Sequence, residues 1–244
     1  MIASRLVPSF ERFGAAHLAV LAATALTSTG LARAVRGSPG STRGWIVRVS
    51  LVVLLLGLTG VFLAQAAARG LLRWWDFVPL QLCDMAIFVA AYALLSLNRL
   101  ASEIVYFWAG AGTLIAMLMP DLAAGFPSWE FVFFFGLHAA VLVSAAVLTF
   151  GFGLRPRRGA ALRVLGWTNL YALGVGLVNV TTGSNFMYLR AKPQQASVLD
   201  WMGPWPFYLL GAELFALVLF LALEWAAVRN SATSNSSLSI EERQ

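Results

Sequence analysis

The single cysteine of this chain is followed directly by an acid, in the stretch PLQLCDMAIFVAAY at residues 79–92. Cys83 and Asp84 stand near the start of a run that is otherwise apolar enough for a lipid bilayer. Helical spacing places Cys83 on one face with Pro79 and Ile87, about one turn below the start of the helix. A helix N-terminus favours the reactive thiolate, which makes Cys83 a candidate nucleophile. A small packed hydrophobe is the alternative interpretation.

His138 lies in a later apolar run and is the candidate base for this thiol. It shares a helix face with Glu130 and Phe134, because the three residues recur at intervals of four. A neutral imidazole can accept a proton from a thiol or from an incoming hydroxyl group. Glu130 lies about 12 Å along the helix, too far to orient the ring. A third member is therefore expected from another helix, with Asp84 and Glu213 as the candidates.

Apolar segments long enough to cross a membrane position these residues. The chain has 244 residues, of which 59% are hydrophobic and 11% charged, whereas soluble domains have about 25% charged residues. About 20 apolar residues cross the hydrocarbon layer, and backbone groups in lipid must bond internally. We therefore predict an all-α fold, a polytopic bundle of about seven transmembrane helices. The predicted spans are 14–32, 49–68, 77–97, 104–119, 131–152, 162–180 and 206–228.

The spans predict one transmembrane domain, residues 1–228, because no segment between them is long enough for a soluble domain. Residues 229–244 are polar and predict a disordered tail. The first span could instead be a cleaved signal peptide, since Arg5 and Arg12 precede it and ARA at 32–34 is a small-residue site. Its length and the arginines that follow it favour a span that is retained.

The basic residues predict the orientation of the bundle, because Lys and Arg accumulate in cytoplasmic loops. If the spans alternate, eleven of the 17 basic residues fall on one side and six on the other. The N-terminus is therefore predicted outside and the tail in the cytoplasm. The larger group comprises Arg33, Arg36, Arg43, Arg48, Arg99, Arg155, Arg157, Arg158, Arg163, Arg229 and Arg243.

Polar side chains gather in the outer half of the predicted bundle. Ionisable groups within a bilayer are costly and usually face the bundle interior, so we predict an outward-facing polar cavity. Interhelical hydrogen bonds that only hold the bundle together are the alternative. His17, near the outer end of the first span, is interpreted as an anchor or rim residue. The candidate binding residues from this region are Gln81, Glu130, Asn179 and Glu213.

The longest predicted outer loop, residues 181–205, adds further candidate binding residues, namely Asn185, Tyr188, Arg190 and Lys192. Loops of this length are often lids, and the two cations could bind a lipid phosphate. An interfacial segment anchored by Trp201 and Trp205 is the alternative.

Several other function classes are disfavoured by the sequence. It has no Walker loop and no dinucleotide fingerprint. Two histidines and one cysteine, far apart, are a weak metal set, so we predict no cofactor and no metal. The net charge of +6 comes mostly from arginines that flank apolar spans, so nucleic acid is not a predicted partner. Without a lysine in the seventh span, a retinal protein is excluded.

Six stretches of the chain together resemble the YwaF-like integral membrane proteins of bacteria, over about residues 74–228. They read PLQLCD, YFWAGAGTLIAMLMPDL, FPSWEF with FFGLHAA, NFMYLRAKP and LDWMGPWPFYLL. That family is remotely similar to an animal transmembrane family implicated in acyl transfer to ether phospholipids, in which a cysteine and a histidine are the proposed active pair. The resemblance implies that Cys83 and His138 form this pair, in a multi-pass protein of the bacterial inner membrane. The bacterial pattern often has a histidine just before Cys-Asp, where this chain has Gln81 and Leu82.

The resemblance, joined to the predicted outward-facing site, implies a phospholipid acyltransferase or transacylase. An outward-facing site has no access to acyl-CoA, so membrane phospholipids are the predicted partners and acyl donors. Cys83 would carry the acyl group as a thioester, and His138 would act as base and then acid. Asn185, Tyr188 or loop amides would stabilise the oxyanion. The alternative is a non-enzymatic transporter or lipid-binding scaffold, although a carrier often has two related halves and none is visible. The sequence predicts no oligomeric state.

Overall fold

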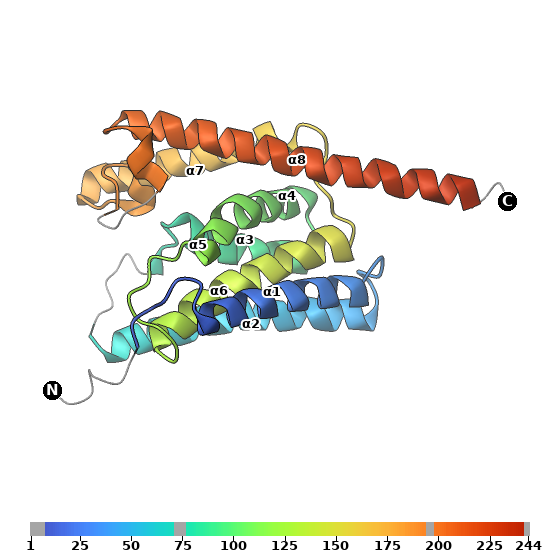
Figure 1. Ribbon diagram of the computed structural model, residues 1–244, viewed down its shortest axis with the longest axis horizontal. Coiled ribbons are helices and arrows are strands. Elements are labelled where there is room, and N and C mark those ends of the chain that lie inside the picture. The colour runs from blue at the N-terminus through green and yellow to red at the C-terminus, as the bar shows by residue number, and fades with distance from the viewer. Residues whose placement is uncertain (1–7, 71–76, 194–197, 242–244) are drawn as a thin grey trace. The chain divides into compact units, whose positions relative to one another are not determined.

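The computed structural model of the protein describes residues 8–70, 77–193 and 198–241. Within these ranges every extended regular element is a helix, so the predicted all-α class is confirmed (Figure 1). Among the described residues, six helical segments are long and apolar enough to cross a membrane, and one shorter apolar helix, Leu82–Ser96, accompanies them. The chain is therefore a multi-pass membrane protein. Residues 194–197 of the predicted lid and 242–244 of the predicted tail lie outside the described residues.

The chain divides into two compact units, residues 1–154 and 155–244. Cys83 and His138 both lie in the first unit. Its elements are α1 (Ala15–Ala34), α2 (Thr42–Ala68), α3 (Leu82–Ser96), α4 (Arg99–Trp108), η3 (Ala109–Thr113), α5 (Leu114–Leu118), α6 (Trp129–Ala146) and η4 (Val147–Gly151).

Helix α6 is the centre of the first unit. It contacts α1, α2, α3, α4 and α5. Within Trp129–Gly151, 56% of the apolar 18-residue stretch is buried, against 11% of the corresponding stretch in α1. Phe131 and Phe135, one turn apart on α6, pack with Met117 of α5 in a buried cluster. Because α6 is held from several sides, a side chain on it has a well-defined position.

Polar side chains cap the N-terminal ends of three helices in the first unit, α2, α4 and α6. Ser41, Asn98 and Ser128 each accept a hydrogen bond from a backbone N–H three residues later, at 3.0–3.1 Å. Such caps satisfy amide groups that have no partner within the helix. Asn98 lets α4 follow α3 after only two residues, so the fourth span begins at Arg99, five residues before the predicted start.

One short π-helical segment interrupts the fourth span and another ends the fifth, where plain α-helix was expected. The segment η3 has the sequence AGAGT and η4 the sequence VLTFG. The end of η4 shows the wider turn directly, because the N–H of Phe152 donates to the carbonyl of Val147 at 2.8 Å. Such bulges often accompany functional sites, because they displace one side chain from the regular helical face.

Arg48 of α2 fixes the C-terminal end of α3. Its guanidinium donates to the carbonyl groups of Leu94 and Leu95. These carbonyls belong to the last turn of the helix, where they have no intrahelical donor and where a cation is favourable. With this end anchored to α2, the opposite end of α3 presents Cys83 at a defined place.

The second unit contains α7 (Ala160–Thr182), η5 (Phe186–Tyr188), η6 (Val198–Met202) and α8 (Phe207–Glu241). Helices α7 and α8 contact each other. The carboxylate of Glu224 on α8 accepts from the N–H groups of Gly159 and Ala161 at 2.7 and 2.8 Å, which caps the start of α7. Helix α8 continues past the predicted seventh span to Glu241, because extending an existing helix costs little free energy.

Candidate functional site

Cys83, Asp84 and His138 line one small cavity of about 40 Å³ in the first unit. The remaining lining residues are Ile87, Thr113, Leu137 and Val141. They come from three helical segments, α3, η3 and α6. A single water needs about 10–15 Å³ of such space, so the cavity can hold a few atoms, such as an ester carbonyl group, but not a lipid headgroup.

Cys83 is the second residue of α3, and its side chain is partly buried. Gln81 has extended backbone angles at the N-cap position, and α3 begins at Leu82. Cys83 and Ile87 both line the cavity, as their spacing of four residues predicts. The N–H groups of Leu82 and Cys83 belong to the first turn of the helix, which offers them no carbonyl partner.

The ring of His138 is held by its own helix. Nδ1 lies 2.7 Å from the carbonyl oxygen of Phe134, one turn earlier on α6. A carbonyl can only accept, so Nδ1 carries the hydrogen and the neutral ring has an unprotonated Nε2. The Phe134 ring also stacks on the imidazole at 4.2 Å between centroids. Nε2 has no hydrogen bond within the described part of the chain, which leaves it available to accept a proton.

His17 differs from His138, because both of its ring nitrogens are bonded. Nδ1 accepts from the N–H of Phe13 at 2.9 Å, and Nε2 lies 2.7 Å from the carbonyl oxygen of Met117, to which it donates. The side chain is only 1% exposed. His17 is therefore a buried residue that joins α1 to α5, not the rim residue expected from its position, because the segment before α1 folds over it.

Three other predicted site residues lie near the start of a helix in the first unit. Asp84 is exposed, stands in the first turn of α3 and lines the cavity with Cys83. Gln81 and Glu130 are not among the residues that line it. The exposed carboxylate of Glu130 accepts a hydrogen bond from the indole N–H of its neighbour Trp129.

Two asparagines of the second unit shape the segment after α7. The buried amide of Asn179, near the end of α7, makes three hydrogen bonds to the loop that follows, to the N–H and carbonyl of Phe186 and to the Ser184 hydroxyl, at 2.8–2.9 Å. Asn185 accepts from the N–H groups of Arg190 and Ala191 at 2.9 and 3.1 Å, and it donates to the carbonyl of Ala191 at 2.8 Å. These side chains hold the loop in one conformation.

The cations predicted to bind phosphate also have partners in this loop. The Arg190 guanidinium donates to the carbonyl groups of Asn179 and Ser184, both at 3.2 Å. The ammonium of Lys192 lies 3.9 Å from the carboxylate of Asp200. The carbonyl of Tyr188 accepts from the hydroxyl of Tyr208. A role for these residues in lipid binding stays a prediction.

Glu213, the last predicted binding residue, accepts a hydrogen bond from the amide of Asn169 at 2.7 Å. The bond links α8 to α7, as expected for a polar residue that only holds two helices together. Because Phe134 already occupies Nδ1 of His138, the ring does not need Glu213 or Asp84 to orient it.

Thr113 is a cavity residue that sequence reasoning missed. It is 2% exposed, ends the π-helical segment η3 and lines the cavity with Cys83 and His138. Threonine is common in membrane helices, so its type gave no signal. The small-residue sequence AGAGT was the only available sign of an irregular turn.

Comparison with known proteins places the chain in a family. The sequence model of the TMEM164 family matches residues 12–224, so the chain belongs to this family. No curated protein and no solved structure gives a significant match. In the described ranges no cluster of three His, Cys, Asp or Glu side chains could hold a metal ion.

Proposed function

We propose that this member of the TMEM164 family transfers an acyl chain between membrane phospholipids through a thioester on Cys83. The observation that carries the proposal is the cavity shared by the Cys83 thiol and a histidine whose Nε2 is available as a base. A thiol attacks a carbonyl as the thiolate, so a proton acceptor beside it is the first requirement of this chemistry.

The first half of the reaction forms the acyl-enzyme. The Cys83 sulfur attacks the ester carbonyl carbon of a phospholipid while Nε2 of His138 takes the thiol proton. As the ester C–O bond breaks, His138 returns this proton to the leaving lysophospholipid oxygen. The negative charge of Asp84, on the same cavity, would favour the imidazolium that exists between these two steps.

The second half transfers the acyl group to an acceptor. A hydroxyl group of a lysophospholipid attacks the thioester, and His138 takes its proton. The C–S bond breaks, the proton returns to the Cys83 sulfur, and the new ester leaves. A cavity of only about 40 Å³ leaves little room for water beside a bound acyl group, which favours transfer over hydrolysis.

The first turn of α3 is the nearest source of oxyanion stabilisation. Its N–H groups at Leu82 and Cys83 have no intrahelical acceptor, and the N-terminal end of a helix favours negative charge. Such donors are worth about 2.7–4 kcal/mol in acyl-transfer enzymes. Asn185 is a weaker candidate for this role, because its amide already binds the loop backbone.

The test is to trap the acyl-enzyme. Purified protein in vesicles of phosphatidylethanolamine and phosphatidylglycerol is supplied with an isotope-labelled lysophospholipid. Intact mass and peptide mapping should show an acyl group on Cys83 that hydroxylamine removes, together with labelled diacyl product. Cys83→Ala should abolish both. His138→Ala should lower the transfer rate by about 10²–10⁴-fold, the usual contribution of a general base.

A matched control separates chemistry from folding. Thr29→Val alters an exposed hydroxyl on α1 that bonds only to its own helix, so the transfer rate should not change. If the wild type forms no thioester, and Cys83→Ala leaves the lipid products unchanged, the acyl-transfer proposal is wrong. The cavity would then belong to a lipid-binding or transport protein.

A further inference from the structure

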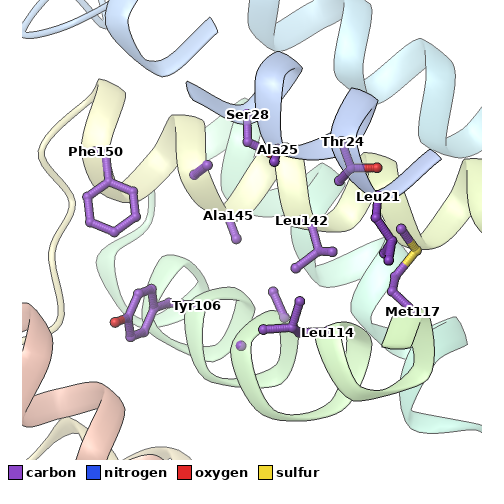
Figure 2. A pocket seen from close by; sticks show the side chains of 13 residues that line it. Leu21, Thr24, Ala25, Ser28, Tyr106, Leu114, Met117, Leu142, Ala145 and Phe150 are labelled. Atoms are coloured by element: carbon purple, nitrogen blue, oxygen red, sulfur yellow. The ribbon is translucent and has the colours of Figure 1, made fainter. Parts of the chain in front are cut away.

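A second, larger cavity lies in the first unit between α1, the continuous segment α4–η3–α5, and α6. Its volume is about 280 Å³. Figure 2 shows side chains from all three helical segments pointing toward one another around it. The lining residues are Leu21, Thr24, Ala25, Ser28, Tyr106, Ala109, Gly110, Leu114, Met117, Leu142, Ala145, Ala146 and Phe150.

The lining of this cavity is almost entirely apolar. Only Thr24, Ser28 and Tyr106 bring a hydroxyl group. The hydroxyl of Thr24 donates to the carbonyl of Val20 at 2.7 Å, so it is already satisfied within α1. Water or a polar ligand would lose hydrogen bonds on entering such a space, whereas hydrocarbon would not.

The cavity is elongated along the helices. On α6 and η4 its lining runs from Leu142 to Phe150, a distance of about 12 Å, and on α1 from Leu21 to Ser28, about 10 Å. Figure 2 shows Tyr106 and Phe150 at one end and Leu21 and Met117 at the other. Dry cavities of about 150 Å³ accept benzene, so this volume has room for roughly twice as many carbon atoms, arranged as a chain.

The two cavities share two helical segments, α4–η3–α5 and α6. Leu142 of the larger cavity follows His138 of the smaller one by a single turn of α6. Leu114 directly follows Thr113 in the other segment. The π-helical turn η3 contributes Thr113 to the smaller cavity and Ala109 and Gly110 to the larger one. Along α6, the larger cavity therefore begins where the Cys83–His138 cavity ends.

We propose that the larger cavity binds one acyl chain of a glycerophospholipid, with the ester group of that chain beside Cys83. The lipid-facing surface of these membrane-spanning helices already contacts acyl chains, and the cavity is continuous with it, since Ala25 both lines the cavity and is exposed. The placement of the ester rests on the proposed acyl transfer. Binding of the chain does not, because it needs only the apolar lining.

The experiment maps the chain by photolabelling. The full-length protein is placed in phosphatidylethanolamine and phosphatidylglycerol vesicles that contain a phosphatidylcholine with a diazirine near the end of one acyl chain. After irradiation, labelled peptides should include residues from Leu142 to Phe150. The labelling should saturate, and excess unlabelled phosphatidylcholine should reduce it.

Two alanines of α1 provide a matched pair of variants. Ala25→Phe should fill the cavity and lower labelling of the lining at least fivefold, and it should shift any transferred chains toward shorter lengths. Ala23→Phe should change neither, because Ala23 is also exposed but is not part of the lining. Both changes place a phenyl ring at an exposed helix position, so they should perturb folding equally little.

The outcomes separate this inference from the acyl-transfer proposal. Saturable labelling that Ala25→Phe removes, in a protein that forms no thioester, supports the chain site and overturns the chemistry. A thioester on Cys83 without saturable labelling of the lining supports the acyl-transfer proposal and overturns the chain site. Labelling that does not saturate, and that is equal in Ala25→Phe and Ala23→Phe, overturns the chain site.

Discussion

At the scale of single residues, hydrogen-bond partners decide which buried polar groups are available for chemistry. The acceptor for Nδ1 of His138 is the carbonyl of Phe134 on the same helix, so the tautomer needs no carboxylate from another span. His17 has the same side chain, yet both of its nitrogens are used. The two histidines differ because two backbone groups lie within hydrogen-bond distance of the His17 ring and one lies within that distance of the His138 ring. Their depth along a span does not decide this.

Thr149 gives a stability prediction at this scale. Its side chain is fully buried in η4, and its hydroxyl oxygen has no partner among the described residues. A buried hydroxyl without a partner costs free energy, so an isosteric methyl group is better tolerated. Thr149→Val should therefore raise the free energy of unfolding by about 1 kcal/mol. Thermal unfolding in detergent micelles, followed by tryptophan fluorescence, measures the change.

The control for Thr149 is a buried hydroxyl that does have a partner. The hydroxyl of Ser144 donates to the carbonyl of Ala140 at 2.7 Å. Ser144→Ala should lower the stability by about 0.6 kcal/mol, the same size as the mean for side-chain hydrogen bonds between membrane helices. A loss of stability in Thr149→Val would show that its hydroxyl has a partner in the folded protein.

The sequence was informative where a residue type is rare in its setting. A thiol, a carboxylate and an imidazole are unusual within apolar spans, so Cys83, Asp84 and His138 could be selected before their common cavity was known. Thr113 could not be selected, because hydroxyl groups are ordinary in such helices. The Phe134 carbonyl that orients His138 could not be predicted from the sequence either, since every residue has a backbone carbonyl.

At the scale of elements, the loop after α7 is held by side-chain amides. The Asn179 amide bonds to the N–H and carbonyl groups of Phe186. The Asn185 oxygen accepts hydrogen bonds from the N–H groups of Arg190 and Ala191. Asn179→Ala would leave the backbone groups of Phe186 without these bonds, at a cost of about 1–3 kcal/mol. The loop should then open more often, and trypsin should cleave after Arg190 at least about tenfold faster.

This cleavage assay has an internal advantage and a matched control. Trypsin cuts poorly at Lys192 because Pro193 follows it, so the signal comes from Arg190. Thr181→Ala removes a hydroxyl that bonds only to carbonyls of its own helix, Leu177 and Val178, and it should leave the rate unchanged. Equal cleavage of Asn179→Ala and wild type in detergent micelles would show that other contacts hold the loop.

Helix boundaries and irregular turns were the least predictable part of the fold. Apolar length located the spans, but α2 begins at Thr42, seven residues before the predicted start, because Ser41 caps it. The π-helical turns η3 and η4 have no pattern of their own, since they depend on how neighbouring helices pack. They nonetheless supply Thr113 to one cavity and Phe150 to the other, so the unpredicted elements shape the predicted site.

At the scale of the molecule, contacts within the first unit show which helix ends lie together. The Arg69 guanidinium at the end of α2 lies 4.2 Å from the ring of Trp129, which begins α6. At the other end, the N–H of Gly37, just after α1, donates to the carbonyl of Gly151 at 2.8 Å. Both contacts agree with spans that alternate in direction. They do not depend on which side faces the cytoplasm.

The orientation stays a prediction that depends on charge. Six basic residues on the Cys83 side against eleven on the other place the site outside. A reporter that is active only outside the cytoplasm, such as alkaline phosphatase, should be active when fused after Gly70 and inactive when fused after residue 228. Green fluorescent protein should show the opposite pattern. If both reporters are reversed, the site faces the cytoplasm. Acyl-CoA would then be an available donor, and the case for a phospholipid donor would lose its main support.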